Sequence, residues 1–277
     1  MFELVAVFAA LTMGLGTFLT KGITTQIPFL TTLGPLFLFN CLFTLPIAFV
    51  QGGDWVVFEP KILALHVSAA ITSVIAGYFI FVIIKRSSAS ISSISSTLSP
   101  AVALVLAPIW LGTSVSALQV VAVIALIAAS LYPIRSSIPG LRLGKTIFFT
   151  LSAALATGFV SVNVAVLGVE GISVSETFIV RQALAGLICL AIFPPRGLTK
   201  NDLFKLIQRA SLISVGSIAS VYALQGGEII LMVSILATVS LWVLIFESIS
   251  YKSIPDRSTI IAAVIAVVGI VSLRFVS

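Results

Sequence analysis

Charged residues are scarce in this chain of 277 residues, and that scarcity limits what kind of protein it can be. Asp, Glu, Lys and Arg make up only 9% of the sequence, whereas soluble domains carry roughly 25%. Hydrophobic residues make up 59%. Because so few charges could not cover the surface of a soluble fold, the composition indicates that lipid is the main solvent.

Residue types that serve catalysis or bind metals are also rare. The chain has one histidine (His66), two cysteines (Cys41 and Cys189) and nine acidic residues, which form no catalytic triad or metal-ligand spacing. The segment PGLRLGKT at 139–146 resembles a phosphate-binding loop, but Pro139 stands where that motif needs its first glycine. We therefore expect no enzyme, no cofactor and no metal site, and we expect the cysteines to be packing residues.

Long apolar runs, by contrast, are abundant. A helix needs about 20 mostly apolar residues to cross a bilayer, and continuous runs such as 121–131 are unlike the short alternating segments of a β-barrel. The sequence predicts an all-α integral membrane protein with ten transmembrane helices, the first of them a retained span and not a signal peptide. The expected spans are 3–21, 33–51, 62–84, 91–111, 117–134, 147–168, 176–193, 207–227, 228–249 and 258–275.

Basic residues gather on one side of these spans. Twelve Lys and Arg residues follow odd-numbered spans, two lie on the other side, and Arg181 lies within the seventh span. Since basic loops are normally cytoplasmic, we predict odd-numbered loops in the cytoplasm and both termini outside, in a plasma or inner membrane. This asymmetry explains the net charge of +6 better than nucleic-acid binding, because no basic stripe is interleaved with aromatic residues.

The two halves of the chain are weakly similar. Asn40 and Arg181 begin similar apolar runs 141 residues apart, Gly14 and Gly158 are 144 apart, and the ends of the halves align at an offset of 140. A nearly constant offset indicates an internal repeat. Because each copy has five spans, an odd number, the copies enter the membrane from opposite sides, as in many secondary transporters.

We therefore divide the chain into a first five-helix repeat at 1–135, a basic linker at 136–146 and a second five-helix repeat at 147–277. In transporters built from inverted repeats, the solute binds near the midplane between the copies.

Several short motifs resemble a known family. They are Met13-Gly14 through Lys21, the small residues of 88–100 that end in Pro100, Leu111-Gly112 through Ser116 and Gln119, and Arg181. Together they resemble ten-span EamA-type members of the drug/metabolite transporter superfamily. The resemblance implies an alternating-access transporter, an exporter of amino acids or related metabolites, with a central cavity lined mainly by spans 1, 3, 4, 6, 8 and 9.

The fourth span begins with an unusually polar segment. Nine of the thirteen residues in 87–99 carry a hydroxyl group. On a helix, Ser92, Ser95 and Ser99 fall on one stripe, which belongs inside the bundle and not against lipid. Such a stripe either lets helices pack closely or lines an aqueous substrate cavity, and we predict the latter. Pro100 cannot donate a backbone hydrogen bond and is the expected hinge.

Other polar and aromatic residues are candidates for the same cavity. Those predicted to line it are Tyr78, Asn163, Tyr222, Gln225, Ser234, Thr238 and Trp242. For Arg181 a structural anchor and a binding site for a substrate carboxylate are both open, and for His66 an interfacial position and a proton relay.

The expected partners are a small-molecule solute and the lipid bilayer, with no nucleic acid. Two other functions stay open: a flippase of a lipid-linked sugar or another amphipathic lipid, and a membrane scaffold or receptor that transports nothing.

Overall fold

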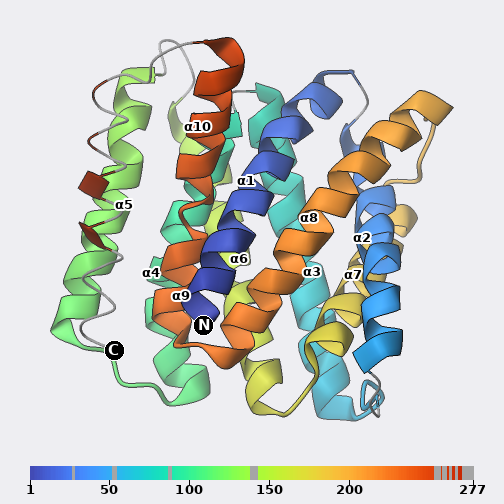
Figure 1. Ribbon diagram of the computed structural model, residues 1–277, viewed down its shortest axis with the longest axis horizontal. Coiled ribbons are helices and arrows are strands. Elements are labelled where there is room, and N and C mark those ends of the chain that lie inside the picture. Colours follow the sequence, from blue (N-terminus) through green and yellow to red (C-terminus); the bar gives the residue numbers. More distant parts are fainter. Residues whose placement is uncertain are drawn as a thin grey trace.

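The computed structural model describes residues 1–26, 29–51, 55–86, 89–137 and 143–252, with a few isolated positions beyond. Every regular element in this described part is an α-helix, and the helices form one bundle (Figure 1). The helices are α1 (Phe2–Gln26), α2 (Phe29–Gln51), α3 (Pro60–Arg86), α4 (Ala89–Leu111), α5 (Ala117–Ser137), α6 (Leu143–Val169), α7 (Val174–Ile192), α8 (Lys200–Gly226), α9 (Ile229–Leu236) and α10 (Val239–Tyr251).

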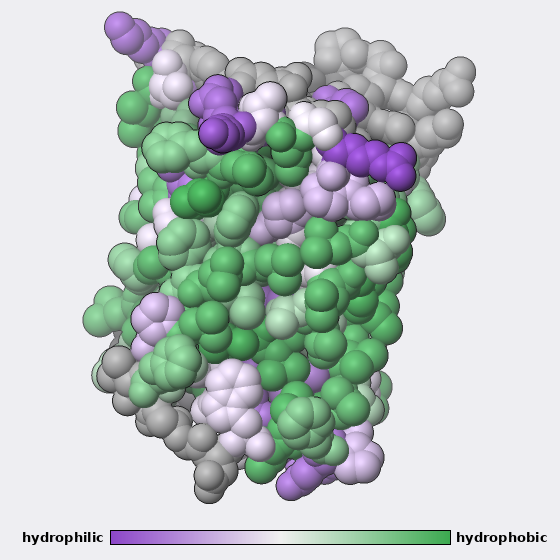
Figure 2. Space-filling model, turned by 90° about the vertical axis from the view of Figure 1, so that its right-hand side faces the viewer, coloured by the Kyte–Doolittle hydropathy of each residue, from purple (hydrophilic) through white to green (hydrophobic). Residues whose placement is uncertain are grey.

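Seven stretches of the described helices are long and apolar enough to cross a membrane. They are Phe2–Thr20, Leu30–Phe49, Pro60–Lys85, Phe148–Val169, Val174–Ile192, Lys200–Gly226 and Ile229–Ser250. Each coincides with an expected span, and α4 and α5 occupy two more of the expected positions. The expected tenth span, 258–275, lies outside the described residues apart from isolated positions. On the face shown in Figure 2, hydrophobic residues form the broad middle of the molecule and hydrophilic residues gather toward its ends.

The ninth span is broken in its middle. It consists of α9 and α10, which Ala237 and Thr238 separate. No proline lies in this break, whereas α4 runs without interruption through Pro100 and Pro108. The interruption thus falls in the second half of the chain and not at Pro100.

Local sequence signals set several helix ends. Gly112, with a φ of 64°, follows α4 in the left-handed conformation that suits glycine. Before α5, the Ser116 N–H donates to Gln119 Oε1 at 2.9 Å and the Gln119 N–H donates to Ser116 Oγ at 3.1 Å. This reciprocal pair is a capping box, which gives the Ser-x-x-Gln part of the sequence motif a structural reason.

Helices from the two halves pack against one another. Helix α1 packs on α8, α3 packs on α6, and α2 packs on α7. Figure 1 shows α1 and α8 side by side along their length. Two glycines permit close approaches: a β-carbon on Gly14 would lie 2.6 Å from Trp242 Cβ in α10, and one on Gly158 would overlap Val102 in α4.

Candidate functional site

A cavity of about 270 Å³ lies inside the bundle, enclosed by α1–α4 and α6–α10. Its α1 residues, Met13 and Thr17, belong to the second half of that helix, and its α2 residues fall within 33–40, near the start of α2. From Leu224 near the end of α8 and Val233 in α9, the cavity therefore extends to the end of the molecule where α1 ends and α2 begins. That is the end at which the basic loops lie.

The cavity wall is apolar with polar groups set into it. The polar lining residues besides arginine are Thr17, Asn40, Ser73, Ser99, Thr157, Ser161, Gln182, Ser217 and Ser220. Several hydroxyls donate to a backbone carbonyl one turn earlier: Ser73 to Ala69 O at 2.7 Å and Ser161 to Thr157 O at 3.1 Å. Hydroxyls bonded in this way can still accept a hydrogen bond from a solute in the cavity, because their oxygen lone pairs are free.

Two arginines supply the charge of the cavity. Arg181, in the middle of α7, is 6% exposed, and its guanidinium carbon lies 5.6 Å from the ring centre of Phe178. Arg209 of α8 donates from Nε to Thr20 Oγ1 and lies 5.3 Å from the ring centre of Phe81. Within the described part of the chain, no acidic residue lines the cavity and neither arginine forms an ion pair.

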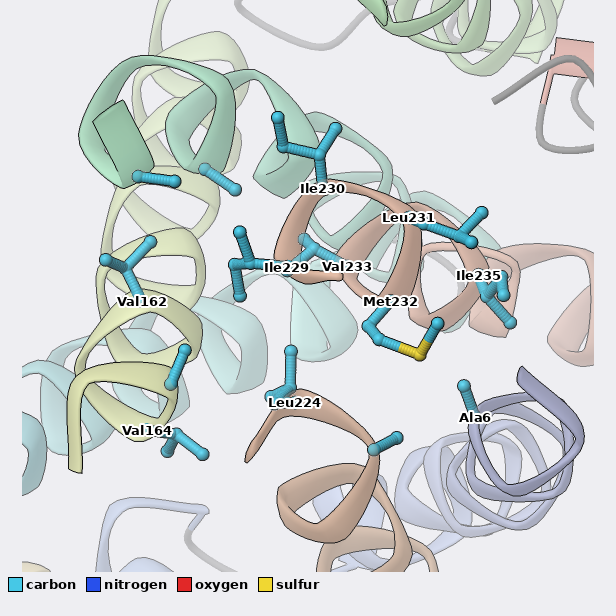
Figure 3. Packing of buried hydrophobic residues seen from close by; sticks show 14 of the residues in the cluster. Ala6, Val162, Val164, Leu224, Ile229, Ile230, Leu231, Met232, Val233 and Ile235 are labelled. Carbon is cyan, nitrogen blue, oxygen red and sulfur yellow. The ribbon is translucent and has the colours of Figure 1, made fainter. Parts of the chain in front are cut away.

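A hydrophobic cluster closes the opposite end of the bundle. It joins the start of α1 at Ala6 to the end of α6 at Val162 and Val164, to Leu224, and to most of α9 (Figure 3). Helix α9 and the start of α1 lie beside the N-terminus in Figure 1. Close packing here separates the cavity from that end of the molecule.

A buried polar group lies near the same closed end. His66 of α3 and Glu176 of α7 are 0% and 1% exposed, and His66 Nε2 lies 4.0 Å from Glu176 Oε1. Asn163 of α6 is fully buried beside α3 and accepts a hydrogen bond from Ser68 Oγ at 3.4 Å. These contacts link α3 to α6 and α7.

Comparison with known proteins agrees with this architecture. The profile of the EamA-like transporter family matches residues 1–133. The first half of the chain belongs to the EamA-like transporter family. The resemblance inferred from the sequence motifs is thereby confirmed over this half of the chain, and it indicates a membrane transporter of the drug/metabolite transporter type.

The other comparisons add the fold. No curated protein matches the chain. One solved structure, titled only "Crystal structure of protein", aligns with a TM-score of 0.73 over 99% of this chain and 96% of its own, at 12% identity. At that identity the likeness shows a shared fold alone, and it extends over both halves of the EamA-like chain.

The hydroxyl-rich helix of this EamA-like protein contributes Ser99 to the cavity. Ser99 is 3% exposed, and Pro100 beside it is also buried. Ser92 and Ser95 lie on α4, but their side chains are outside the described part of the structure. Their place in the cavity therefore stays a prediction, as does the role of Pro100 as a hinge.

The three aromatic candidates lie around the cavity and not among its lining residues as described. Tyr78 follows the lining residue Gly77 and stacks on Phe193, with ring centres 6.3 Å apart. Trp242 packs against α1 at Gly14. Tyr222 is 36% exposed, contacts the ring of Phe2 at 5.3 Å and faces an outward groove.

The remaining candidates bond to the protein itself. Gln225 donates to Ile172 O at 3.2 Å and to Thr177 Oγ1 at 2.8 Å, which ties α8 to α7. Ser234 and Thr238 each donate to a backbone carbonyl at 2.7 Å. With Asn163, these residues are absent from the described cavity lining. The structure thus gives each of them a bond within the helices, and their contact with a solute stays a prediction.

Arg209 is the main cavity residue that the sequence did not predict: the expected span 207–227 includes it, but the charge count placed it with the basic loops. A local signal was present, since Thr199 and Asp202 form a capping box that begins α8. The Asp202 N–H donates to Thr199 Oγ1 at 3.2 Å, and the Thr199 N–H donates to Asp202 Oδ2 at 2.9 Å. Because α8 begins at Lys200, Arg209 lies well inside the helix, and its side chain reaches the cavity.

Proposed function

We propose that this protein is a secondary transporter that exports small organic solutes, such as amino acids or related metabolites, across the cell membrane. The solute binds in the cavity between the halves, which opens to one side of the membrane at a time. The observation that carries the proposal is a cavity inside the helix bundle whose largely apolar wall carries polar groups from both halves, beside a hydrophobic cluster at one end.

Paired contacts support an arrangement of two inverted five-helix repeats. If α1 corresponds to α6 and α3 to α8, the packing of α1 on α8 has its counterpart in the packing of α6 on α3. Gly14 meets Trp242 as Gly158 meets Val102, and Val102 and Trp242 are 140 residues apart, the offset expected for the repeat. A symmetric pair of contacts of this kind suits a carrier whose halves rock against each other.

The broken ninth span supports alternating access. Helices α9 and α10 contribute Val233, Leu236 and Val239 to the cavity wall on both sides of the break. Interrupted helices in transporters characteristically occur where the backbone lines a cavity. Bending at Ala237 and Thr238 would move the hydrophobic cluster relative to the cavity.

A second groove, on the outside of the bundle, is the observation that supports a lipid flippase as the alternative function. It lies between α1, α2 and α8, is lined mainly by apolar residues such as Val5, Phe43 and Ile47, and includes Tyr222. An outward apolar groove of this kind suits the chain of an amphipathic lipid.

Reconstitution in liposomes tests the proposal. We expect saturable uptake for at least one member of a panel of labelled amino acids and their keto acids, stimulated by unlabelled solute on the other side. Ser161→Phe, which fills the cavity, should reduce that uptake about tenfold or more. Leu155→Phe on the same helix is the control, because Leu155 is 60% exposed on the outer surface of the bundle.

Two results would contradict the proposal. The first is uptake no greater than in empty liposomes for the whole panel. The second is equal uptake by the Ser161→Phe variant and the control. Scrambling of a fluorescent polyprenyl-phosphate lipid without uptake of any soluble solute would favour the flippase.

A further inference from the structure

The charge of the cavity is one-sided. Arg181 and Arg209 both line it, and no acidic residue does so within the described part of the chain. In the bundle of a membrane protein, an ionisable side chain is costly and is normally paired with a partner of opposite charge. The cavity therefore holds two cationic groups without the anion that would compensate them.

Among the described residues, Arg181 has fewer recorded interactions than Arg209. It is 6% exposed, its Nε has no hydrogen-bond partner in the described structure, and its nearest recorded interaction is with the Phe178 ring. Glu176 lies on the same helix but faces His66, with Nε2 and Oε1 4.0 Å apart, and forms no ion pair with Arg181. A merely structural anchor would be expected to have its charge paired, since an unpaired buried charge destabilises a protein.

Arg209 has more recorded interactions with the protein than Arg181, but it too has no acidic partner among the described residues. Thr20 accepts its Nε hydrogen bond, and Phe81 lies beneath its guanidinium group. Neither contact neutralises the cation. Asn40 and Gln182 add amide groups to the same wall, which could donate further hydrogen bonds to an anion.

We infer that the transported solute is a small organic anion without a compensating positive charge, and that its carboxylate binds at Arg181. This inference rests on the proposed transport function and narrows its substrate class. The planar guanidinium group binds carboxylates through two parallel hydrogen bonds, which gives both affinity and orientation. Arg209 attracts the same anion, and Leu36, Phe37 and Phe81 contact its apolar part. A zwitterionic amino acid is a poorer ligand, because no acidic side chain of the described lining meets its ammonium group.

The test compares three solutes with the same carbon frame and different charge. Phenylpyruvate is an anion, phenylalanine a zwitterion and phenylalaninamide a cation at neutral pH. In liposomes that contain the full chain, we expect phenylpyruvate to compete best for labelled phenylpyruvate uptake, phenylalanine to compete weakly and phenylalaninamide not at all. Phenylpyruvate should also raise the melting temperature of the detergent-solubilised protein more than phenylalanine does.

Substitution of Arg181 tests the residue directly. Arg181→Gln should weaken phenylpyruvate affinity about 30-fold or more, the usual effect of removing one partner of a buried charge pair, whereas Arg181→Lys should retain part of it. Without ligand, Arg181→Gln should be at least as thermostable as the unsubstituted protein, because it removes an unpaired buried cation. Arg196→Gln removes the same charge from an exposed position after α7 and should leave affinity unchanged.

The possible outcomes distinguish failure of the anion inference from failure of the proposed transport function. Saturable uptake of phenylalanine or phenylalaninamide in preference to phenylpyruvate would overturn the anion inference and leave the transport function standing. Unchanged phenylpyruvate affinity in Arg181→Gln would overturn the role of Arg181. Failure of every solute of the panel, whatever its charge, would overturn the transport function and this inference with it.

Discussion

Polar side chains inside this bundle bond mainly to the backbone and to neighbouring helices. Thr20, Thr44 and Ser234 each donate to the carbonyl four residues earlier, at 2.7–2.8 Å. Such bonds satisfy a hydroxyl where no water is present. A polar residue inside a transmembrane helix is therefore weak grounds for a solute contact, and the position of the cavity has to decide between the two roles.

Gln225 is a clear case of a residue that the structure ties into the protein. Gln225→Ala should lower thermal stability, by about 1–3 kcal/mol, because Ile172 O and Thr177 Oγ1 lose their donor. Uptake per folded molecule should stay close to normal. Differential scanning fluorimetry and liposome uptake measure the two effects, and Gln208→Ala on the exposed side of α8 is the control. Normal stability with lost uptake would instead make Gln225 a solute-binding residue.

At the scale of the helices, close packing depends on a few glycines. Gly158 brings α6 onto α4, where a β-carbon would lie 3.0 Å from Ser99 O and overlap Val102. Gly14 brings α1 onto α10 in the same way. The sequence pairs these two glycines at a repeat offset, and in the structure each one packs against a helix of the other half.

Substitution of these glycines tests the contact. Gly158→Ala should destabilise the protein by about 1–3 kcal/mol through overpacking, and Gly14→Ala should have a similar effect. Gly77→Ala is the matched control, because the nearest atom to a β-carbon there is 3.4 Å away. That variant should be neutral or slightly more stable, since alanine favours the helix. Equal melting temperatures for all three variants would contradict the close approach of α6 and α4.

The sequence predicts the helices well and their interruptions poorly. Nine of the ten expected spans overlap described helices, and seven of these helices are apolar and long enough to cross a membrane, because a bilayer dictates their length. The break at Ala237 and Thr238 has no proline to announce it, and tertiary packing sets its position. Pro100, the strongest local signal for a break, lies in a continuous helix because the structure around α4 accommodates it.

At the scale of the whole molecule, both halves enclose a largely apolar cavity with polar groups in its wall, and apolar residues close one end of the bundle. Composition and repeats predict the membrane fold and the general location of the site. They could not predict the two arginines facing one cavity, since Arg181 and Arg209 come from different helices and only the packed bundle brings them to the same wall. That arrangement is the basis for the proposal that the transported solute is an organic anion.

Accessibility of Ser217 tests the central claim, alternating exposure of this cavity, most directly. In a chain whose Cys41 and Cys189 are replaced by alanine, Ser217→Cys places a thiol in the cavity wall. We predict that an impermeant anionic methanethiosulfonate modifies it from either face of sealed vesicles, that transported solute slows the reaction, and that Ser234→Cys, buried outside the described lining, stays unmodified. Modification of Ser217→Cys from one face only under every condition, or from neither, would contradict the account.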